Sequence, residues 1–215
     1  MQPLALNPTD DQEARYPEWV FSGEAENHHY LVPAVLRALG PREARVLDLG
    51  CGNGALTARI HEAGKQVTGV DFTPSGIERA RQTNPGVDFL VHDLNQPLPD
   101  SLRNQFDVVV SAEVIEHLFL PRTLFARCRE ALGQSGRVII TTPLHGFWKN
   151  LAIVVMGQSD HHWDPLADYG HIKFFSKKTL RQIATESGFQ PIEVVGAGRV
   201  PPLSATMVMT ANLVP

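Results

Sequence analysis

The sequence predicts an α/β fold: a doubly wound, mostly parallel sheet with helices on both faces. Short apolar runs alternate with helix-length amphipathic segments along most of the chain, which is the pattern of repeated strand–helix units. The first apolar run ends in a turn with three glycines, Gly50, Gly52 and Gly54, as expected where a strand leads into a helix at a ligand site. Because no repeat or linker divides the chain, we expect residues 1–215 to form a single domain.

The composition is that of an ordinary globular protein, with 43% hydrophobic and 20% charged residues. Its formal net charge of −4 gives no basic field for nucleic acid, although Lys173, Lys177, Lys178 and Arg181 could form a local basic patch. Two cysteines are too few for a disulfide framework, which favours a cytoplasmic location. The N-terminus lacks the features of a signal peptide, and no apolar run approaches the length of a membrane-spanning helix.

Residues 1–26 are predicted to form a leader and an N-terminal cap, because a polar, proline-bearing stretch is followed by a group of aromatic residues. A helix is predicted over residues 27–39, where apolar residues recur at helical spacing before Gly40 and Pro41 end it. The apolar stripe of this helix is expected to pack on the sheet.

The stretch 45–71 predicts a strand, the glycine turn, a helix over residues 53–61 and a second strand. The apolar run at its start suits a strand buried in a parallel sheet. The glycines allow the backbone to approach a ligand closely, and the amides at the start of the helix point at that ligand. Asp71 follows the second strand, where a carboxylate can hold two ribose hydroxyls.

Asp48 discriminates between the two ligand classes that fit this geometry. The segment Gly50-x-Gly52-x-x-Ala55 satisfies the dinucleotide fingerprint in its Gly/Ala form. A pyrophosphate at this turn would meet the Asp48 carboxylate at close range, which is unfavourable in a partly desolvated pocket. S-adenosylmethionine (SAM) carries a sulfonium and an α-ammonium, which this carboxylate would attract. The residues therefore favour SAM over a dinucleotide.

Further strand and helix signals continue the alternation to the end of the chain. Strands are predicted near residues 67–70, 87–91, 106–111, 136–142, 189–195 and 205–210. Helices are predicted near residues 75–83, 121–132 and 177–187. Right-handed crossovers place the ligand crevice at the carboxyl ends of the strands, around the first one.

The run Val46–Gly54 resembles motif I of the class I SAM-dependent methyltransferases. The resemblance extends through Asp71, His92-Asp93-Leu94 and the strand Phe106–Ser111, and it covers residues 28–195. It implies a Rossmann-like sheet of seven strands in the order 3-2-1-4-5-7-6, with the last strand antiparallel.

The resemblance also implies which residues bind SAM and its product, S-adenosylhomocysteine. Asp93 would bond the exocyclic amine of adenine, and Phe72 would either cover the adenine or simply pack. Tyr16, Trp19 or Tyr30 would close over the methionine end, as N-terminal segments often do in this class. The expected SAM-binding residues are Asp48, Gly50, Cys51, Gly52, Asn53, Gly54, Asp71, Phe72, His92, Asp93, Leu94 and Ser111.

Within the class, the segment Glu113–Leu118 is similar to the Glu-x-x-Glu-His group of ubiquinone-pathway and small-molecule O-methyltransferases, and to the small-RNA 2′-O-methyltransferases. If the chain turns helical after the fourth strand, Glu113, Glu116 and His117 lie on one face of that helix. Two carboxylates and an imidazole suit a divalent cation such as Mg²⁺ or Mn²⁺, with His171 as a fourth ligand. The metal would clamp vicinal oxygens of the acceptor.

Metal-free interpretations of the same residues stay open. His117 or His145 is a candidate general base for the acceptor hydroxyl. His117 could instead only cap local structure. The candidate catalytic residues are therefore Glu113, Glu116, His117 and His145.

Residues 143–171 form a long connection, which we expect to act as a lid over the acceptor. Its apolar, helix-length run, residues 147–156, would wall the acceptor pocket, or alternatively touch a lipid surface. A polar knot follows and could bind metal by composition, although such loops more often face solvent or substrate. Its members are Asp160, His161, His162 and Asp164.

These residues and the resemblance favour methyl transfer to an oxygen of a small, hydrophobic acceptor, phenolic or sugar-derived. The alternatives are N-methylation of a small molecule, 2′-O-methylation of RNA, and a SAM-binding protein without turnover. The acidic net charge speaks against the RNA alternative.

Overall fold

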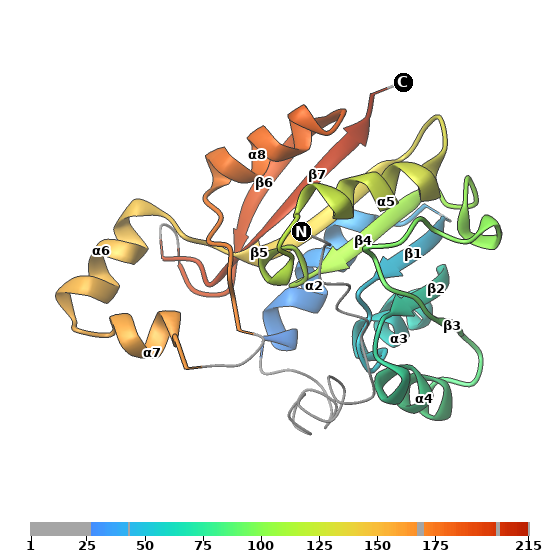
Figure 1. Cartoon of the computed structure of the whole chain (residues 1–215), viewed down its shortest axis with the longest axis horizontal. Coiled ribbons are helices and arrows are strands. Elements are labelled where there is room, and N and C mark those ends of the chain that lie inside the picture. The colour runs from blue at the N-terminus through green and yellow to red at the C-terminus, as the bar shows by residue number, and fades with distance from the viewer. Residues whose placement is uncertain (1–26, 43, 167–169, 201–202, 215) are drawn as a thin grey trace, which may run out of the picture.

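The computed structural model describes residues 27–42, 44–166, 170–200 and 203–214. It has one seven-stranded sheet in the order β3-β2-β1-β4-β5-β7-β6 (Figure 1). Strands β1 to β5 run parallel, whereas β7 runs antiparallel to both β5 and β6. The predicted fold class and strand order are therefore confirmed. The strands are β1 (Arg45–Leu49), β2 (Gln66–Asp71), β3 (Asp88–Val91), β4 (Val108–Ala112), β5 (Arg137–Pro143), β6 (Phe189–Ala197) and β7 (Thr206–Leu213).

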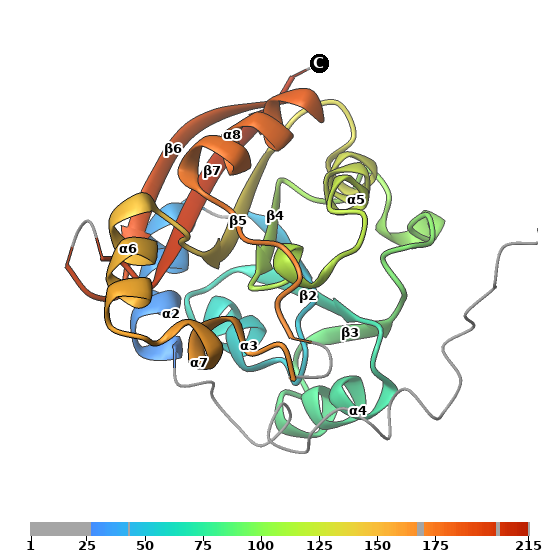
Figure 2. The ribbon, with the colours of Figure 1, turned by 60° about the vertical axis from the view of Figure 1, so that its left-hand side comes forward.

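The helices pack on both faces of the sheet (Figure 2). Helices α5 and α8 share one hydrophobic core with the sheet, and α2, α3 and α4 share the other. The helices are α2 (His28–Leu39), α3 (Ala55–Glu62), α4 (Pro74–Thr83), α5 (Arg122–Leu132), α6 (Phe147–Val155), α7 (Ser159–Trp163) and α8 (Lys177–Glu186). Two single 3₁₀ turns, η2 (Asp100–Leu102) and η3 (Ile115–His117), complete the described elements.

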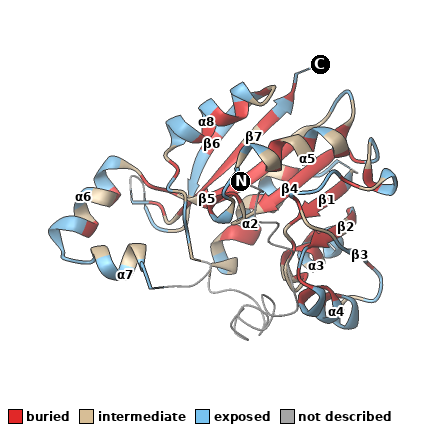
Figure 3. Cartoon of the chain, viewed as in Figure 1, coloured by how far each residue is buried: buried red, intermediate tan, exposed pale blue. Residues whose placement is uncertain are grey.

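Side chains alternate along the central strands, so each strand contributes residues to both hydrophobic cores. In β1, Leu47 and Leu49 join the core under α5 and α8, whereas Val46 joins the core under α2, α3 and α4. Because both faces are covered, the central strands are buried along almost their whole length (Figure 3). This buried sheet fixes the strand ends that carry the polar residues of the site.

Two boundaries near the expected site differ from the sequence prediction. Helix α3 begins at Ala55 rather than at residue 53, because Gly54 takes a left-handed backbone conformation with φ of 78°. The helical path that was considered for the residues directly after β4 does not form. Glu113 has a φ of 56°, which breaks the helical path, and only the single turn Ile115–His117 follows. Glu113, Glu116 and His117 therefore do not share a helix face.

The predicted lid contains α6 and α7, which stand apart from the sheet (Figure 1). These helices show much more exposed surface than the central strands (Figure 3). Among the residues that the structure describes, no helix is long and apolar enough to cross a membrane. Residues 1–26, including Tyr16 and Trp19, lie outside the described residues, so the N-terminal cap and the single-domain organisation of 1–215 stay predictions.

Candidate functional site

A pocket of about 170 Å³ lies at the carboxyl ends of β1 and β4. Asp48 and the turn residues 50–53 form one side of it, and Ala112 and Glu113 form another. Leu31 of α2 also lines it. The pocket is thus at the point in the sheet where the sequence predicts the ligand crevice.

The glycine turn is held close to the second strand and leaves room beside its own backbone. The amides of Gly50 and Cys51 both donate to the carbonyl oxygen of Val70, at 2.7 and 3.0 Å. Gly50 has a φ of 82°, and a Cβ there would lie 2.4 Å from Val114. Gly52 has a φ of 55°, but a Cβ there would meet no atom within 4 Å. The turn therefore needs glycine for packing at Gly50, and at Gly52 it borders open space in which a ligand fits.

Asp48 is an acid whose hydrogen bonding is incomplete. Its side chain is buried, and one carboxylate oxygen, Oδ2, accepts a hydrogen bond from Thr57 at 2.7 Å. The other oxygen, Oδ1, is buried and has no hydrogen-bond partner among the described residues. Burial raises the pKa of Asp48 to about 7; the nearby Asp71 charge contributes to the rise, and the hydrogen bond from Thr57 opposes it. A cation in the pocket would complete this site, so the residues present fit the ammonium end of SAM.

Asp71 connects the second strand to the turn. Its Oδ2 accepts from the Gly52 amide at 2.9 Å, and its Oδ1 accepts from the amide and hydroxyl of Thr73. Phe72, next along the chain, is 41% exposed. Neither residue lines the pocket itself.

The other expected SAM-binding residues have different local roles. Asp93 accepts from the backbone and side-chain nitrogens of Asn95 at 2.9 Å, and His92 lies 3.3 Å from the carbonyl oxygen of Gln96. The Leu94 side chain belongs to the hydrophobic core. Ser111 is buried and donates to the carbonyl oxygen of Leu49 at 2.7 Å, which joins β4 to β1. Their contacts with a cofactor stay predictions.

Glu113 lines the pocket beside the glycine turn. Its Oε1 accepts from the hydroxyls of Thr141 and Thr206, each at 2.8 Å. Burial raises the pKa of Glu113, whereas these two hydroxyls lower it. Glu113 thus lines the pocket that contains Asp48 and is hydrogen-bonded to β5 and β7.

The other three residues proposed as metal ligands converge. Single ligand atoms of Glu116, His117 and His171 all lie within 4.8 Å of one another, whereas Glu113 is not part of this group. Glu116 is fully buried; its Oε2 accepts from Thr142 at 2.9 Å, and His171 Nε2 lies 4.0 Å from its Oε1. Burial, and then the charge of Glu113, raises the pKa of Glu116 well above its usual range. His117 is exposed and lies 3.2 Å from the carbonyl oxygen of Gly170.

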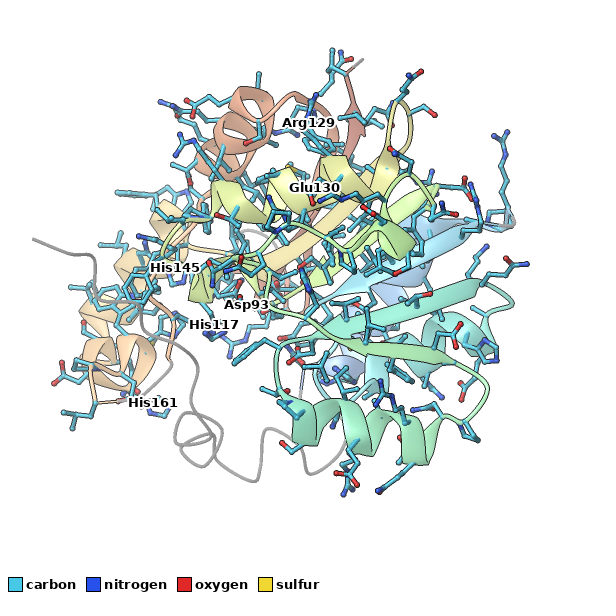
Figure 4. All side chains as sticks on the ribbon, turned by 45° about the vertical axis from the view of Figure 1, so that its right-hand side comes forward. Asp93, His117, Arg129, Glu130, His145 and His161 are labelled. Carbon is cyan, nitrogen blue, oxygen red and sulfur yellow. The ribbon has the colours of Figure 1, made fainter. Side chains whose placement is uncertain are left out.

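His145 lies at the base of the lid, on the same side of the molecule as His117 (Figure 4). Its ring centroid is 4.9 Å from that of Phe174 and 5.5 Å from that of His162. Its Nδ1 is buried without a hydrogen-bond partner in the part of the chain that is described. Burial, and then the charge of Lys149, lowers the pKa of His145 to about 4. The four residues of the polar knot differ in their surroundings. His162 lies against His145, whereas Asp160, His161 and Asp164 are exposed.

The comparison with known proteins explains this combination of fold and pocket. A family model described as "Methyltransferase domain" matches residues 24–194. The chain belongs to this methyltransferase family. The ubiquinone biosynthesis O-methyltransferase of Idiomarina loihiensis is 27% identical over 187 residues, which are 83% of this chain and 76% of the relative. That of Coxiella burnetii (strain Dugway 5J108-111) is 23% identical over 209 residues, which are 91% of this chain and 88% of the relative.

Solved structures agree with the methyltransferase fold. PH0226 from Pyrococcus horikoshii has a TM-score of 0.71 at 18% identity, over 94% of this chain and 98% of that one. The 1,6-didemethyltoxoflavin-N1-methyltransferase of Burkholderia thailandensis, solved with S-adenosylhomocysteine, has a TM-score of 0.64 at 22% identity, over 86% and 77%. The protein is a SAM-dependent methyltransferase, and the recognised class is confirmed.

Polar residues that the sequence did not single out lie beside the candidate site. Lys149 is only 6% exposed, and its Nζ donates to the carbonyl oxygen of Ala205 at 3.1 Å. Burial, followed by the charge of Arg199, lowers the pKa of Lys149 to about 8. The available signal was that Lys149 is the one charged residue within the apolar run 147–156. Thr141 and Thr206 had no signal, because buried threonines are common in strands.

Proposed function

We propose that this methyltransferase transfers the methyl group of SAM to a hydroxyl of a small, hydrophobic acceptor, phenolic or sugar-derived. The observation that carries the proposal is the position of Glu113, which lines the SAM pocket and accepts hydrogen bonds from β5 and β7 on the lid side. Relatives named ubiquinone biosynthesis O-methyltransferase support oxygen as the accepting atom.

The residues of the pocket would mainly bind and orient. SAM supplies a methyl group already activated on a sulfonium. Asp48 would hold the ammonium end through its unpartnered Oδ1, and Asp71 would hold the ribose hydroxyls beside the glycine turn. Fixing the two reacting groups in one orientation removes much of the entropic cost of a bimolecular reaction.

The acceptor hydroxyl must lose its proton during transfer. His145 suits a metal-free route, because burial lowers its pKa and the ring is uncharged at neutral pH, so one ring nitrogen is able to accept a proton. A base with this pKa is weak, and its main contribution would be a fixed position rather than strong basicity. Glu113 and Glu116, whose carboxyl pKa values are both raised, would hold or pass on the proton.

The proposal is tested in two steps. Titration calorimetry with SAM and with NAD should give binding of SAM only. The protein is then incubated with SAM and with matched catechols, phenols, sugars and aromatic amines, and mass spectrometry locates the transferred methyl group. Methylation of hydroxyl compounds is the expected result. Transfer to nitrogen alone would support the N-methyltransferase alternative, and SAM binding with no transfer would support a non-catalytic protein.

A divalent cation would add a metal-assisted form of this proposal. Glu116, His117 and His171 present a carboxylate and two imidazoles, and the buried Oε1 of Glu116 lacks a hydrogen-bond partner among the described residues. A cation held there would supply positive charge that orients acceptor oxygens and favours the ionised hydroxyl. Metal content of the purified protein and activity under chelation provide the test. Full activity in excess EDTA would exclude metal assistance.

Contact with a lipid surface is a second part of the proposal, and the exposure of α6 supports it. Trp148 is 61% exposed, Val155 is 76% exposed and Met156 is 64% exposed. Lys149, which would suit a headgroup contact, is instead buried. Co-sedimentation with phosphatidylglycerol vesicles should fall when Trp148 and Val155 are both replaced by serine. An unchanged bound fraction would speak against lipid contact.

The small-RNA alternative is tested in the same preparation. Filter binding to a short duplex RNA should give no retention at low salt, where electrostatic binding is strongest. The cytoplasmic location stays part of the proposal; Cys51 and Cys128 are both free and buried, as in a protein kept reduced.

A further inference from the structure

The lid helix α6 buries a cation. Lys149 is 6% exposed, although the large apolar residues around it in sequence, Phe147 and Trp148, are more than half exposed. The helix therefore turns its polar residue inward and part of its apolar surface outward, the reverse of the usual pattern. Burying an ammonium costs several kcal/mol unless a partner compensates for the lost water.

Among the described residues, Lys149 has fewer hydrogen-bond partners than an ammonium can use. An ammonium has three N–H donors, and the described part of the chain offers Lys149 one hydrogen-bond acceptor, the carbonyl oxygen of Ala205 at 3.1 Å. In the described ranges, no carboxylate oxygen lies within 4.0 Å of its Nζ. Arg199 adds a second positive charge nearby, whereas Glu113 is the acid whose charge acts on Lys149.

Lys149 is located where the cofactor pocket meets the lid. Its acceptor, Ala205, precedes Thr206, whose hydroxyl donates to Glu113 at 2.8 Å. Its charge also acts on His145 and His162, whose ring centroids lie 5.5 Å apart. Glu113 lines the pocket proposed for SAM. A bound, positively charged SAM would therefore interact with the Glu113 carboxylate, whose negative charge otherwise compensates the charge of Lys149.

We propose that Lys149 is a specificity-determining residue that binds an ionised carboxylate of the acceptor. The inference rests on the proposed function and narrows its substrate class to hydroxylated organic acids. An acceptor carboxylate supplies the missing counter-charge of Lys149, and its binding is strongest after SAM has occupied the pocket beside Glu113. Neutral acceptors of the same shape leave the ammonium buried and unpaired, so they bind more weakly.

The test compares acids with their amides, which differ in charge but hardly in shape. Titration calorimetry in the presence of saturating sinefungin, an unreactive SAM analogue with an amine in place of the methylated sulfur, uses two pairs: 3,4-dihydroxybenzoate with 3,4-dihydroxybenzamide, and salicylate with salicylamide. At least one acid should bind the unmodified protein at least about tenfold more tightly than its amide. Lys149→Met should abolish this preference and Lys149→Arg should retain it. Lys177→Met, which removes an exposed lysine, serves as the matched control.

Two results would overturn the proposal: no acid binds more tightly than its amide, or the preference survives in Lys149→Met. If Lys149→Met does not fold, the preference in the unmodified protein and its retention in Lys149→Arg decide the question. S-adenosylhomocysteine binding is measured first. Absence of S-adenosylhomocysteine binding would count against the proposed function. Binding of S-adenosylhomocysteine without a preference for acids would count only against the role proposed for Lys149.

Discussion

The hydroxyl of Thr206 lies 2.8 Å from Oε1 of Glu113, and it joins the start of β7 to the residue that follows β4. The same carboxylate oxygen accepts from Thr141 on β5 at 2.8 Å. Three strand ends thus meet at one acidic side chain, and the left-handed backbone of Glu113, with a φ of 56°, turns it there. A residue in this strained conformation persists only where its surroundings hold it.

Replacement of Thr206 by valine should weaken this junction. The variant loses the hydroxyl that bonds Glu113 and the carbonyl oxygen of Thr142, and the free energy of unfolding should fall by about 1 kcal/mol. Urea denaturation measures the change. Thr210→Val on the same strand is the matched control, and a loss no larger than that of the control would contradict the role given to Thr206.

Asp48 should make the ligand-free protein less stable as pH rises. Burial raises its folded-state pKa to about 7, above an ordinary value of 3.8, so the folded state holds the proton longer than the unfolded state. This stabilising contribution is complete below the ordinary value and is lost as pH rises through about 7, by about 4 kcal/mol at most. Asp48→Asn lacks the contribution, and the two proteins are compared by urea denaturation across this range. Parallel curves would contradict the prediction.

Binding of SAM should expel the Asp48 proton. A cation beside the carboxylate favours its charged form, so SAM affinity should rise with pH up to about 7, by at most tenfold per pH unit, and then level off. Calorimetry in two buffers with different ionisation enthalpies counts the released proton. In Asp48→Asn the affinity should be much weaker, and the proton release attributable to residue 48 should disappear.

Alanine substitutions at two glycines of the turn should have different effects. In Gly50→Ala the new Cβ meets Val114 at 2.4 Å, so stability should fall by about 2–4 kcal/mol through strain and overpacking. In Gly52→Ala the Cβ meets no protein atom within 4 Å, so backbone strain of about 1–2 kcal/mol remains as the cost. Gly52→Ala should instead lose most of its SAM affinity. Thermal unfolding and calorimetry separate the two effects, and equal stability losses would argue against this assignment.

The fold could be predicted because its signals are local and repeated. The apolar run before Gly50 and the alternating segments after it identify parallel strands whichever helix covers them. The strand order and the antiparallel β7 came from the family resemblance, and the structure confirms both. Element ends were less accurate where one backbone angle decides them, as at Gly54.

The site could be predicted only in part. Asp48 was predicted from its chemistry, and the structure places it, buried, in the lining of the pocket beside the glycine turn. Its contact with a cationic ligand stays a prediction. The helical arrangement of Glu113 with His117 was wrong, because nothing in the sequence indicates that a glutamate takes a positive φ. Lys149 was missed, because a lysine in an apolar helix suggests a lipid interface and its inward orientation depends on tertiary contacts with Ala205.

The antiparallel pairing of β7 also determines how the chain between β6 and β7 can be engineered. Met207 and Met209 belong to one hydrophobic core and Val208 to the other, so side chains alternate strictly along the strand. An insertion or deletion that slips β7 by one position would exchange these cores and turn Thr206 away from Glu113. Loop grafts between β6 and β7 must therefore preserve the pairing of Pro143 with Thr206.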